Sequence, residues 1–181
     1  MDVQIKALKI FFSNYNKNLK IYRDENNEIV IDGDIIIFDN MYTHFPVKFH
    51  KLNGSLSWRG YIDGFKKGSL ESLINFPDIV TGDVRIYKNA NLKSLKYCPK
   101  IIGGHFQCND CNISDISELP EEIGGSLVLS NNPLIDVSNL NNSHIKGDIY
   151  LLNTKVKDFN SIKLQNDSSL IITEHLTNDI F

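Results

Sequence analysis

Short stretches in which apolar and polar residues alternate recur along the chain, and each stretch opens with a glycine. In residues 125–137, with the glycine as position zero, apolar residues stand at positions two and four and an asparagine at position seven. Apolar residues return at positions nine and twelve. The opening glycines are Gly33, Gly54, Gly82, Gly104, Gly125 and Gly147. Most are 21 or 22 residues apart, and such a fixed period predicts a repeat solenoid.

Each repeat predicts one short strand followed by a turn. Side chains at positions two and four point the same way from a strand. The asparagine at position seven, as in Asn89 and Asn132, can bond backbone groups where the chain leaves the strand. Prolines five residues before a glycine, as at Pro99, break regular structure. A repeat of 21–22 residues leaves little room for a helix, so the sequence predicts a mainly β solenoid with one parallel strand per repeat.

Residues 1–32 predict a cap on the first repeat, built from a helix and a β-hairpin. In residues 1–20 apolar side chains recur at helical spacing, and Asp2 suits the N-cap position. Residues 20–32 hold two apolar segments around a polar turn. The helix carries the aromatic residues Phe11, Phe12 and Tyr15. Because a solenoid needs its open end covered, these rings fit core packing, and a partner-binding helix face is the alternative.

The repeats are expected to span residues 33–172, followed by a C-terminal cap or tail at residues 173–181, all in one domain. A degenerate seventh repeat begins near Ser168, with Leu170 and Ile172 as its inward pair.

One interval is longer than the others, because Gly54 and Gly82 are 28 residues apart. About seven residues are extra, and they fall in the segment 60–68. Insertions in solenoids bulge from one face and often carry binding. The alternative is a tolerated surface insertion, since lengthening a loop has a small entropic cost.

Two repeats match the consensus L-x-L-x-x-N/C-x-L directly, at residues 106–113 and 127–134. Over about residues 33–172 the chain therefore resembles the leucine-rich repeat family. It departs from the family in using Ile, Val and Phe for many leucines, and in the segment 60–68. The short period and the Pro-x-x-Ile-Gly-Gly lead-in look like the compact bacterial and bacteriophage versions. The resemblance implies that a partner binds the concave face of the sheet.

Charge and composition narrow the class of protein. The net charge is -3 at pH 7, which argues against a nucleic acid as primary partner and against an anionic membrane. No run of 18 apolar residues occurs, and the N-terminus lacks the pattern of a signal peptide. The three cysteines cannot form a disulfide framework on their own. We therefore expect a soluble protein of a reducing cytoplasm.

The candidate metal ligands are Cys98, His105, Cys108 and Cys111. The repeat register argues against zinc. Cys108 and Cys111 occupy positions four and seven, where the repeat places buried residues, and His105 at position one points to the opposite face. No cofactor is expected, because the glycine pairs lack the Lys-Ser/Thr of a phosphate loop. No Ser or Cys nucleophile stands with a histidine in a recognisable context, so we expect no enzyme.

The outward face of the predicted sheet is the surface left for function. Positions one, three and five lie on this face, and strand neighbours about 4.8 Å apart would make it one continuous patch. Arg and aromatic side chains commonly anchor protein interfaces. The candidate partner-binding residues are Arg59, Tyr61, Phe65, Lys66, Arg85, Tyr87, His105, Tyr150 and Leu152. For Ile36 and Phe38 the alternative is burial under the N-terminal cap.

These observations predict a non-enzymatic protein that binds another protein through the concave sheet face and the loop 60–68. Abundant Ile, Asn and Lys with only two alanines indicate an AT-rich genome. The hypothesis is a phage- or bacterium-encoded adaptor or inhibitor of a host or defence-related protein, with inhibition proposed by analogy with the family. The alternative is a structural subunit that self-associates through a solenoid edge or the N-terminal helix. The sequence leaves the oligomeric state and the identity of the partner open.

Overall fold

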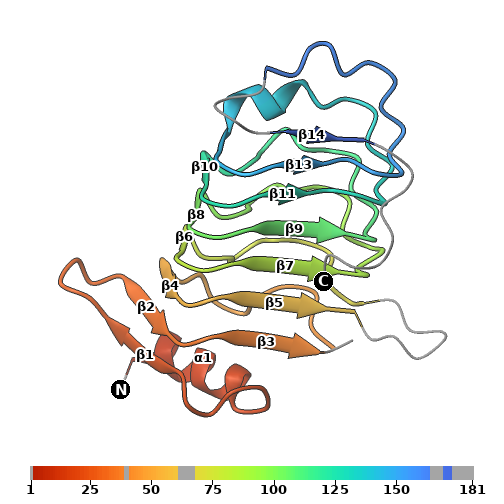
Figure 1. Cartoon of the computed structure of the whole chain (residues 1–181). Helices are drawn as coiled ribbons and strands as arrows, with labels where there is room; N and C mark the ends of the chain where they lie inside the picture. The colour runs from red at the N-terminus through yellow and green to blue at the C-terminus, as the bar shows by residue number, and fades with distance from the viewer. Residues whose placement is uncertain (1, 39–40, 61–67, 164–168, 173–181) are drawn as a thin grey trace.

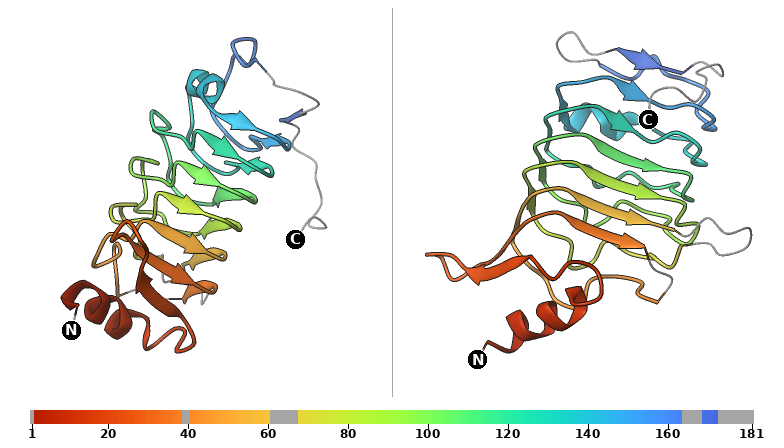
Figure 2. Two further views of the ribbon diagram at one scale, coloured as in Figure 1. Left: turned by 90° about the vertical axis from the view of Figure 1, so that its left-hand side faces the viewer. Right: turned by 60° about the horizontal axis from the view of Figure 1, so that its bottom comes forward.

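The computed structural model describes residues 2–38, 41–60, 68–163 and 169–172. In these residues the chain winds into coils that stack on one another, with the N-terminal helix at one end of the stack (Figures 1 and 2). The described residues form two seven-stranded sheets that run along two sides of the stack. The fold is therefore a mainly β parallel solenoid, as the sequence predicts.

The first sheet has the order β1-β2-β4-β6-β8-β10-β12, and the second has the order β14-β13-β11-β9-β7-β5-β3. The first sheet consists of β1 (Lys20–Arg23), β2 (Ile29–Asp32), β4 (Lys51–Asn53), β6 (Ile79–Val80), β8 (Ile101–Ile102), β10 (Glu122–Ile123) and β12 (His144–Ile145). The second consists of β3 (Ile35–Phe38), β5 (Leu56–Arg59), β7 (Val84–Tyr87), β9 (Phe106–Asn109), β11 (Leu127–Val128), β13 (Ile149–Tyr150) and β14 (Leu170–Ile171). Among these strands only β1 and β2 pair antiparallel. The helices of the described ranges are α1 (Val3–Phe12) and the short 3₁₀ helix η1 (Ser138–Asn142).

The structure differs from the prediction in having two strands per coil rather than one. The second sheet holds the predicted strands, which follow the opening glycine. The strands of the first sheet precede the glycine, and most of them are only two or three residues long. Each of these short strands places one buried residue in the core, such as Leu52, Val80 or Ile102. A strand of two residues has no alternation to recognise, which is why the sequence shows only an isolated apolar position there.

The opening glycines lie where the backbones of successive coils come closest. A Cβ atom added at Gly82 would lie 2.8 Å from the carbonyl oxygen of Gly54, and one at Gly54 would lie 2.5 Å from that of Gly33. Gly33 also has a φ of 114°, which side chains disfavour. The recurring glycines therefore allow the coils to stack closely.

The asparagine at position seven bonds neighbouring backbone groups, as expected from the sequence. Nδ2 of Asn132 donates to the carbonyl of Cys108 at 2.7 Å, and Oδ1 accepts from the N–H of Ile113 at 3.0 Å. Asn89 repeats the arrangement two turns of the solenoid earlier, and its Nδ2 donates to the carbonyl of Tyr87 at 2.8 Å. Both asparagines are buried. They connect their coils to the preceding ones just after β7 and β11.

Cys111 takes the same position in the coil between these asparagines, and the structure gives a reason for the exchange. In the coil before it, the N–H of Leu92 already donates to the carbonyl of Asn89 at 3.0 Å. The N–H of Leu92 corresponds to the N–H of Ile113, which donates to Oδ1 of Asn132. A thiol needs no such donor, and Sγ of Cys111 lies 3.5 Å from the carbonyl oxygen of Asn109.

Helix α1 covers the open end of the solenoid. Oδ1 of Asp2 accepts hydrogen bonds from two backbone N–H groups of the first turn, at 2.9 and 3.1 Å, which confirms the predicted N-cap. Phe11 and Phe12 are buried, and the ring of Phe11 lies 5.7 Å from that of Phe45. Phe45 in turn lies 5.1 Å from Trp58. The aromatic residues of the helix therefore belong to the core, and Tyr15 is partly buried against it.

The helix is shorter than predicted and ends at Phe12 rather than near residue 20. The side chain of Asn16 accepts the N–H of Asn18 at 2.9 Å, so this asparagine-rich segment forms a local turn instead of a helix. The hairpin is where the sequence places it. Oδ1 of Asp24 accepts two backbone N–H groups in its turn. Strand β2 also pairs with β4, so the hairpin extends the first sheet beyond the first repeat.

The far end of the second sheet is β14, which pairs with β13 and places Leu170 opposite Ile149. Ile172 was expected to point inward but is 43% exposed, because β14 ends one residue before it. Residues 173–181 and Ser168 lie outside the described residues. No helix in the described ranges has the length and apolar character needed to cross a membrane.

Candidate binding surface

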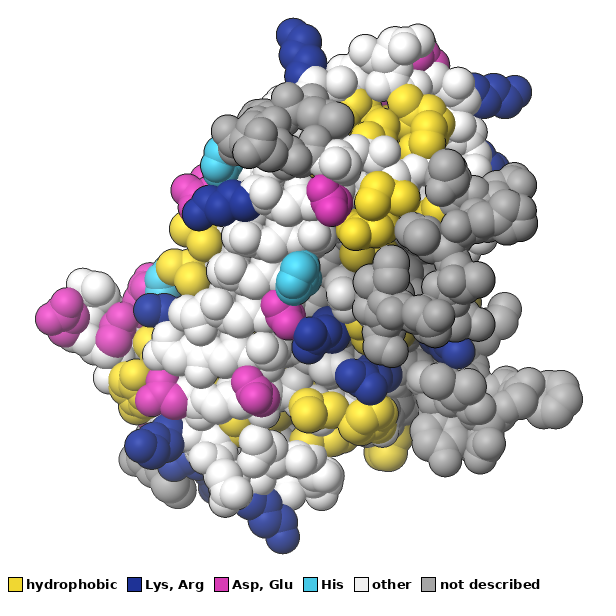
Figure 3. Space-filling view, in the orientation of Figure 1, with side chains coloured by type: hydrophobic (Ala, Val, Ile, Leu, Met, Phe, Trp, Pro, Cys, Tyr) yellow, Lys and Arg dark blue, Asp and Glu magenta, His cyan; other side chains and the backbone are white. Residues whose placement is uncertain are grey.

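The outward face of the second sheet carries rows of side chains that run across the strands. The row at position three consists of Ile36, Ser57, Arg85, Gln107, Val128 and Tyr150. The row at position five begins with Phe38, Arg59, Tyr87 and Asn109. Neighbours in a row are about 4.8 Å apart. Figure 3 shows this face, with basic side chains and a histidine near its centre and hydrophobic side chains above and below them.

Arg59 lies between two aromatic rings on this face. Its Cζ atom is 5.5 Å from the ring centroid of Phe38 and 5.6 Å from that of Tyr87. Its Nε donates to the hydroxyl of Ser57 at 2.9 Å. The three side chains come from adjacent strands, so the sheet itself holds the guanidinium between the rings. We call Ile36, Phe38, Arg59, Arg85 and Tyr87 the arginine–aromatic patch.

Two apolar members of the patch face solvent. Ile36 is 45% exposed and Phe38 is 56% exposed, so the interpretation that the cap covers them is wrong. Helix α1 packs its buried residues against the inward core at the end of the stack, where the aromatic cluster lies. Side chains of β3 alternate between the two faces, and the even-numbered ones point away from that core.

Arg85 and Tyr87 make hydrogen bonds within the face. Nη2 of Arg85 lies 2.5 Å from Oδ2 of Asp83, so its charge is paired. Burial raises the pKa of Tyr87, and this effect outweighs the positive charges of Arg85 and Arg59, which lower it. The hydroxyl of Tyr87 is therefore protonated at neutral pH and bonds to Oε1 of Gln107. These bonds fix the two side chains on the sheet.

The residues at position one form a ladder between coils instead of a free surface. Each side chain accepts a hydrogen bond from the position-one N–H of the next coil, at distances between 2.7 and 3.1 Å. The acceptors are Asp34, Ser55, Asp83, His105, Ser126 and Asp148. His105 is exposed, but its Nδ1 accepts the N–H of Ser126 at 2.9 Å. Its ring therefore has a structural bond in addition to any contact with a partner.

The cysteines lie on the inward side of the coils. Cys108 is fully buried, and its Sγ is 4.0 Å from that of Cys111. Burial and the negative charge of Glu118 raise the pKa of Cys98 to about 12, and the contact with Cys111 together with burial raises that of Cys108. Metal ligation needs thiolates, which these surroundings disfavour. The part of the chain that the structure describes contains no group of three or more potential metal ligands.

Two of the remaining candidates, Tyr150 and Leu152, do not lie with the patch. Tyr150 and Leu152 are half-buried and belong to the coil of β13, four strands from β5 and therefore roughly 19 Å from Arg59. Val128, which lies on β11 between these two coils, is buried. The candidates Tyr61, Phe65 and Lys66 lie outside the described residues. The structure thus brings together Arg59, Arg85 and Tyr87, adds Ile36 and Phe38, and separates Tyr150 and Leu152 from them.

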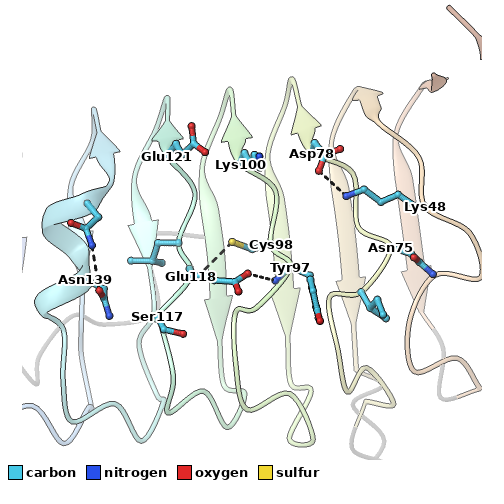
Figure 4. A pocket seen from close by; sticks show the side chains of 13 residues that line it. Lys48, Asn75, Asp78, Tyr97, Cys98, Lys100, Ser117, Glu118, Glu121 and Asn139 are labelled. Atoms are coloured by element: carbon cyan, nitrogen blue, oxygen red, sulfur yellow. Dashed lines mark hydrogen bonds and ion pairs between the residues drawn. The ribbon is translucent and has the colours of Figure 1, made fainter. Parts of the chain in front are cut away.

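A hollow of about 560 Å³ lies on another side of the solenoid (Figure 4). Lys48 and Asp78, two of the charged residues that line it, form an ion pair, and His50 adds a second contact to Asp78. Nζ of Lys48 lies 2.8 Å from Asp78, and Nδ1 of His50 lies 3.2 Å from the same carboxylate. Partial burial raises the pKa of Asp78, but the bonds and charges of Lys48 and His50 outweigh it and lower the pKa. The sequence did not indicate this hollow, because it borders the first sheet, whose strands are too short to recognise.

Comparison of the chain with known protein families, with curated proteins and with solved structures finds no match. The resemblance to the leucine-rich repeat family therefore rests on the repeated motif alone. The fold and the patch define a parallel β-solenoid with an exposed cationic and aromatic surface on one sheet.

Proposed function

We propose that this chain is a non-enzymatic protein-binding solenoid that contacts its partner through the arginine–aromatic patch. The observation that carries the proposal is the guanidinium of Arg59, held between Phe38 and Tyr87 on a rigid sheet. Aromatic and arginine side chains dominate the energy of protein interfaces, particularly where their conformations are fixed before binding. The exposed Ile36 and Phe38 add apolar area at the same place.

The finer proposal is an adaptor or inhibitor, encoded by a phage or a bacterium, that occupies a host or defence-related protein in the cytoplasm. It is supported by the AT-rich coding of the chain and by its likeness to compact bacterial and bacteriophage repeats. A repeat fold supplies a surface rather than a reaction, which agrees with a role in binding.

The test is affinity capture from bacterial lysate, read by mass spectrometry. The patch variant is Phe38→Ala/Arg59→Ala, and the matched control is Lys100→Ala/Ile101→Ala, which removes one basic and one apolar exposed residue beside the first sheet. We expect a protein that wild type and control capture and that the patch variant loses. Thermal unfolding checks that both variants are folded. Equal capture by all three chains would exclude the patch.

A self-associating structural subunit is the second candidate. Strand β3 is the terminal strand of the second sheet in the described residues, and terminal strands can pair with another chain. Its exposed Ile36 and Phe38 would lie at such a contact. Sedimentation at several concentrations separates the candidates: a mass that rises with concentration and falls back in Phe38→Ala would favour self-association.

A further inference from the structure

We infer that the patch recognises an acidic, extended segment of its partner, with a carboxylate on Arg59 and an apolar side chain on Ile36 and Phe38. This inference rests on the proposed function and specifies the chemistry of the partner. It follows from the different surroundings of the two arginines and from the spacing between Arg59 and its apolar neighbours.

Of the two arginines in the patch, Arg59 is the one without a carboxylate partner among the described residues. Within the described ranges no carboxylate forms an ion pair with it, and its one hydrogen bond there uses Nε. Among the described residues, the two Nη groups are therefore left to donate. Arg85, in contrast, is paired with Asp83 at 2.5 Å. The nearby carboxylate of Asp34 stands four residues before Phe38, roughly 13 Å along the strand.

The geometry of Arg59 suits a carboxylate. The rings of Phe38 and Tyr87 flank the guanidinium along the row, and the bond to Ser57 fixes its Nε. A guanidinium with its Nη groups free can give a carboxylate two parallel hydrogen bonds. Because the side chain is already ordered, little of its rotamer entropy remains to be lost on binding.

The apolar neighbours set the rest of the ligand. Phe38 lies directly opposite Arg59, and Ile36 lies diagonally from it, roughly 7 Å away in a sheet. Two residues of an extended peptide also span roughly 7 Å. The patch therefore matches a segment in which an apolar residue stands two positions before or after an Asp or Glu. A phosphorylated segment fits less well, because in the described part of the patch Arg59 alone is an unpaired cation, and its apolar neighbours offer no further donors for a dianion.

The probe is a phage-displayed library of random linear peptides, selected on the immobilised full chain. We expect wild type to enrich peptides with Asp or Glu two residues from an apolar residue. Arg59→Met, which keeps the length of the side chain but removes its charge, should lose that enrichment. Arg59→Lys should keep a weaker preference for acids, and Lys100→Met, the control beside the first sheet, should behave as wild type.

A selected peptide is then synthesised with Glu and with Gln at the acidic position. We expect the Gln peptide to bind wild type at least about tenfold more weakly, and the difference to vanish on Arg59→Met. Selection of peptides without acids, no selection at all, or equal binding to Arg59→Met would overturn the inference. Tighter binding of a phosphoserine version would overturn it in favour of a phosphorylated partner. A partner captured from lysate through the patch would still support the proposed function in each of these cases.

Discussion

Asn132 offers the sharpest test of how the coils are held together. It is 2% exposed, donates to the carbonyls of Cys108, Leu129 and Ser130 at 2.7 to 3.2 Å, and accepts the N–H of Ile113 at 3.0 Å. Two of these partners belong to the preceding coil. The substitution Asn132→Ala removes all four bonds while leaving the backbone groups buried.

The expected loss follows from the groups left without partners. The N–H of Ile113 loses the side-chain oxygen that accepts it. The carbonyl of Cys108 loses its hydrogen bond from Nδ2 of Asn132, which is the shortest of the four. Each buried polar group left unpaired costs about 1–3 kcal/mol. We therefore expect Asn132→Ala to lower the free energy of unfolding by about 3–5 kcal/mol, which is a large part of the 5–15 kcal/mol typical of a domain.

The assay is urea unfolding of wild type and variant, followed by fluorescence and by far-UV circular dichroism. Trp58 is the single tryptophan and is fully buried three coils away, so it reports whether the stack unfolds as a unit. The control is Asn112→Ala, which changes an exposed asparagine and should stay within about 0.5 kcal/mol of wild type. A loss below about 1 kcal/mol for Asn132→Ala, with coincident transitions, would refute the reasoning.

Two further predictions concern the packing of the coils and their response to acid. Gly124→Ala should destabilise the chain by about 2–4 kcal/mol in the same assay, because the new Cβ would meet the carbonyl oxygen of Gly103 at 2.1 Å and backbone cannot move aside easily; an unchanged midpoint would contradict the close stacking. Asp78 has a pKa below its ordinary 3.8 in the folded chain, so its contribution to stability is complete above that value and is lost as the pH falls through the lower folded value. The urea midpoint of Asp78→Asn should therefore change less than that of wild type between mildly acidic and strongly acidic pH, and parallel curves would show that the bonds to Lys48 and His50 do not stabilise the fold.

The main features of the fold could be predicted because the repeat states them many times. A glycine and two inward residues recur in register, and the structure buries the inward pair of each of the six copies from Gly33 to Gly147 in the core. The first sheet could not be predicted as a sheet, since its strands in the middle of the stack are two or three residues long. Its parallel pairing arises from the stacking of the coils and not from local propensity.

The position-one ladder has a signature in the sequence. Asp, Ser and His are the residue types at this position, and each has a side chain that can accept a hydrogen bond. Alternation alone places them outward and predicts that they belong to a binding face. The structure shows that an outward side chain can still be engaged, because it reaches the N–H of the coil beside it. For His105 this means that exposure alone does not identify a contact residue.

The patch depends on the register of the strands in the second sheet, which the hydrogen bonds of Asn89 help to maintain. Nδ2 of Asn89 donates to the carbonyl of Tyr87 at 2.8 Å and to that of Trp58, the residue before Arg59, at 3.3 Å. A slip of one residue between these strands would turn Arg59 or Tyr87 toward the core and separate the stacked groups. We therefore expect Asn89→Ala to weaken both the stability of the chain and the capture of its partner.

The comparison with Asn132 separates the two effects. Asn132→Ala should cost about as much stability, in the range of 3–5 kcal/mol, but it lies two coils beyond Tyr87, so the folded fraction should still capture the partner. Capture is measured at a temperature where both variants are folded and is normalised to the folded fraction. If the two substitutions weakened capture equally, the patch would owe nothing to the bonds of Asn89, and the order of Arg59 between its rings would have to come from the side chains themselves.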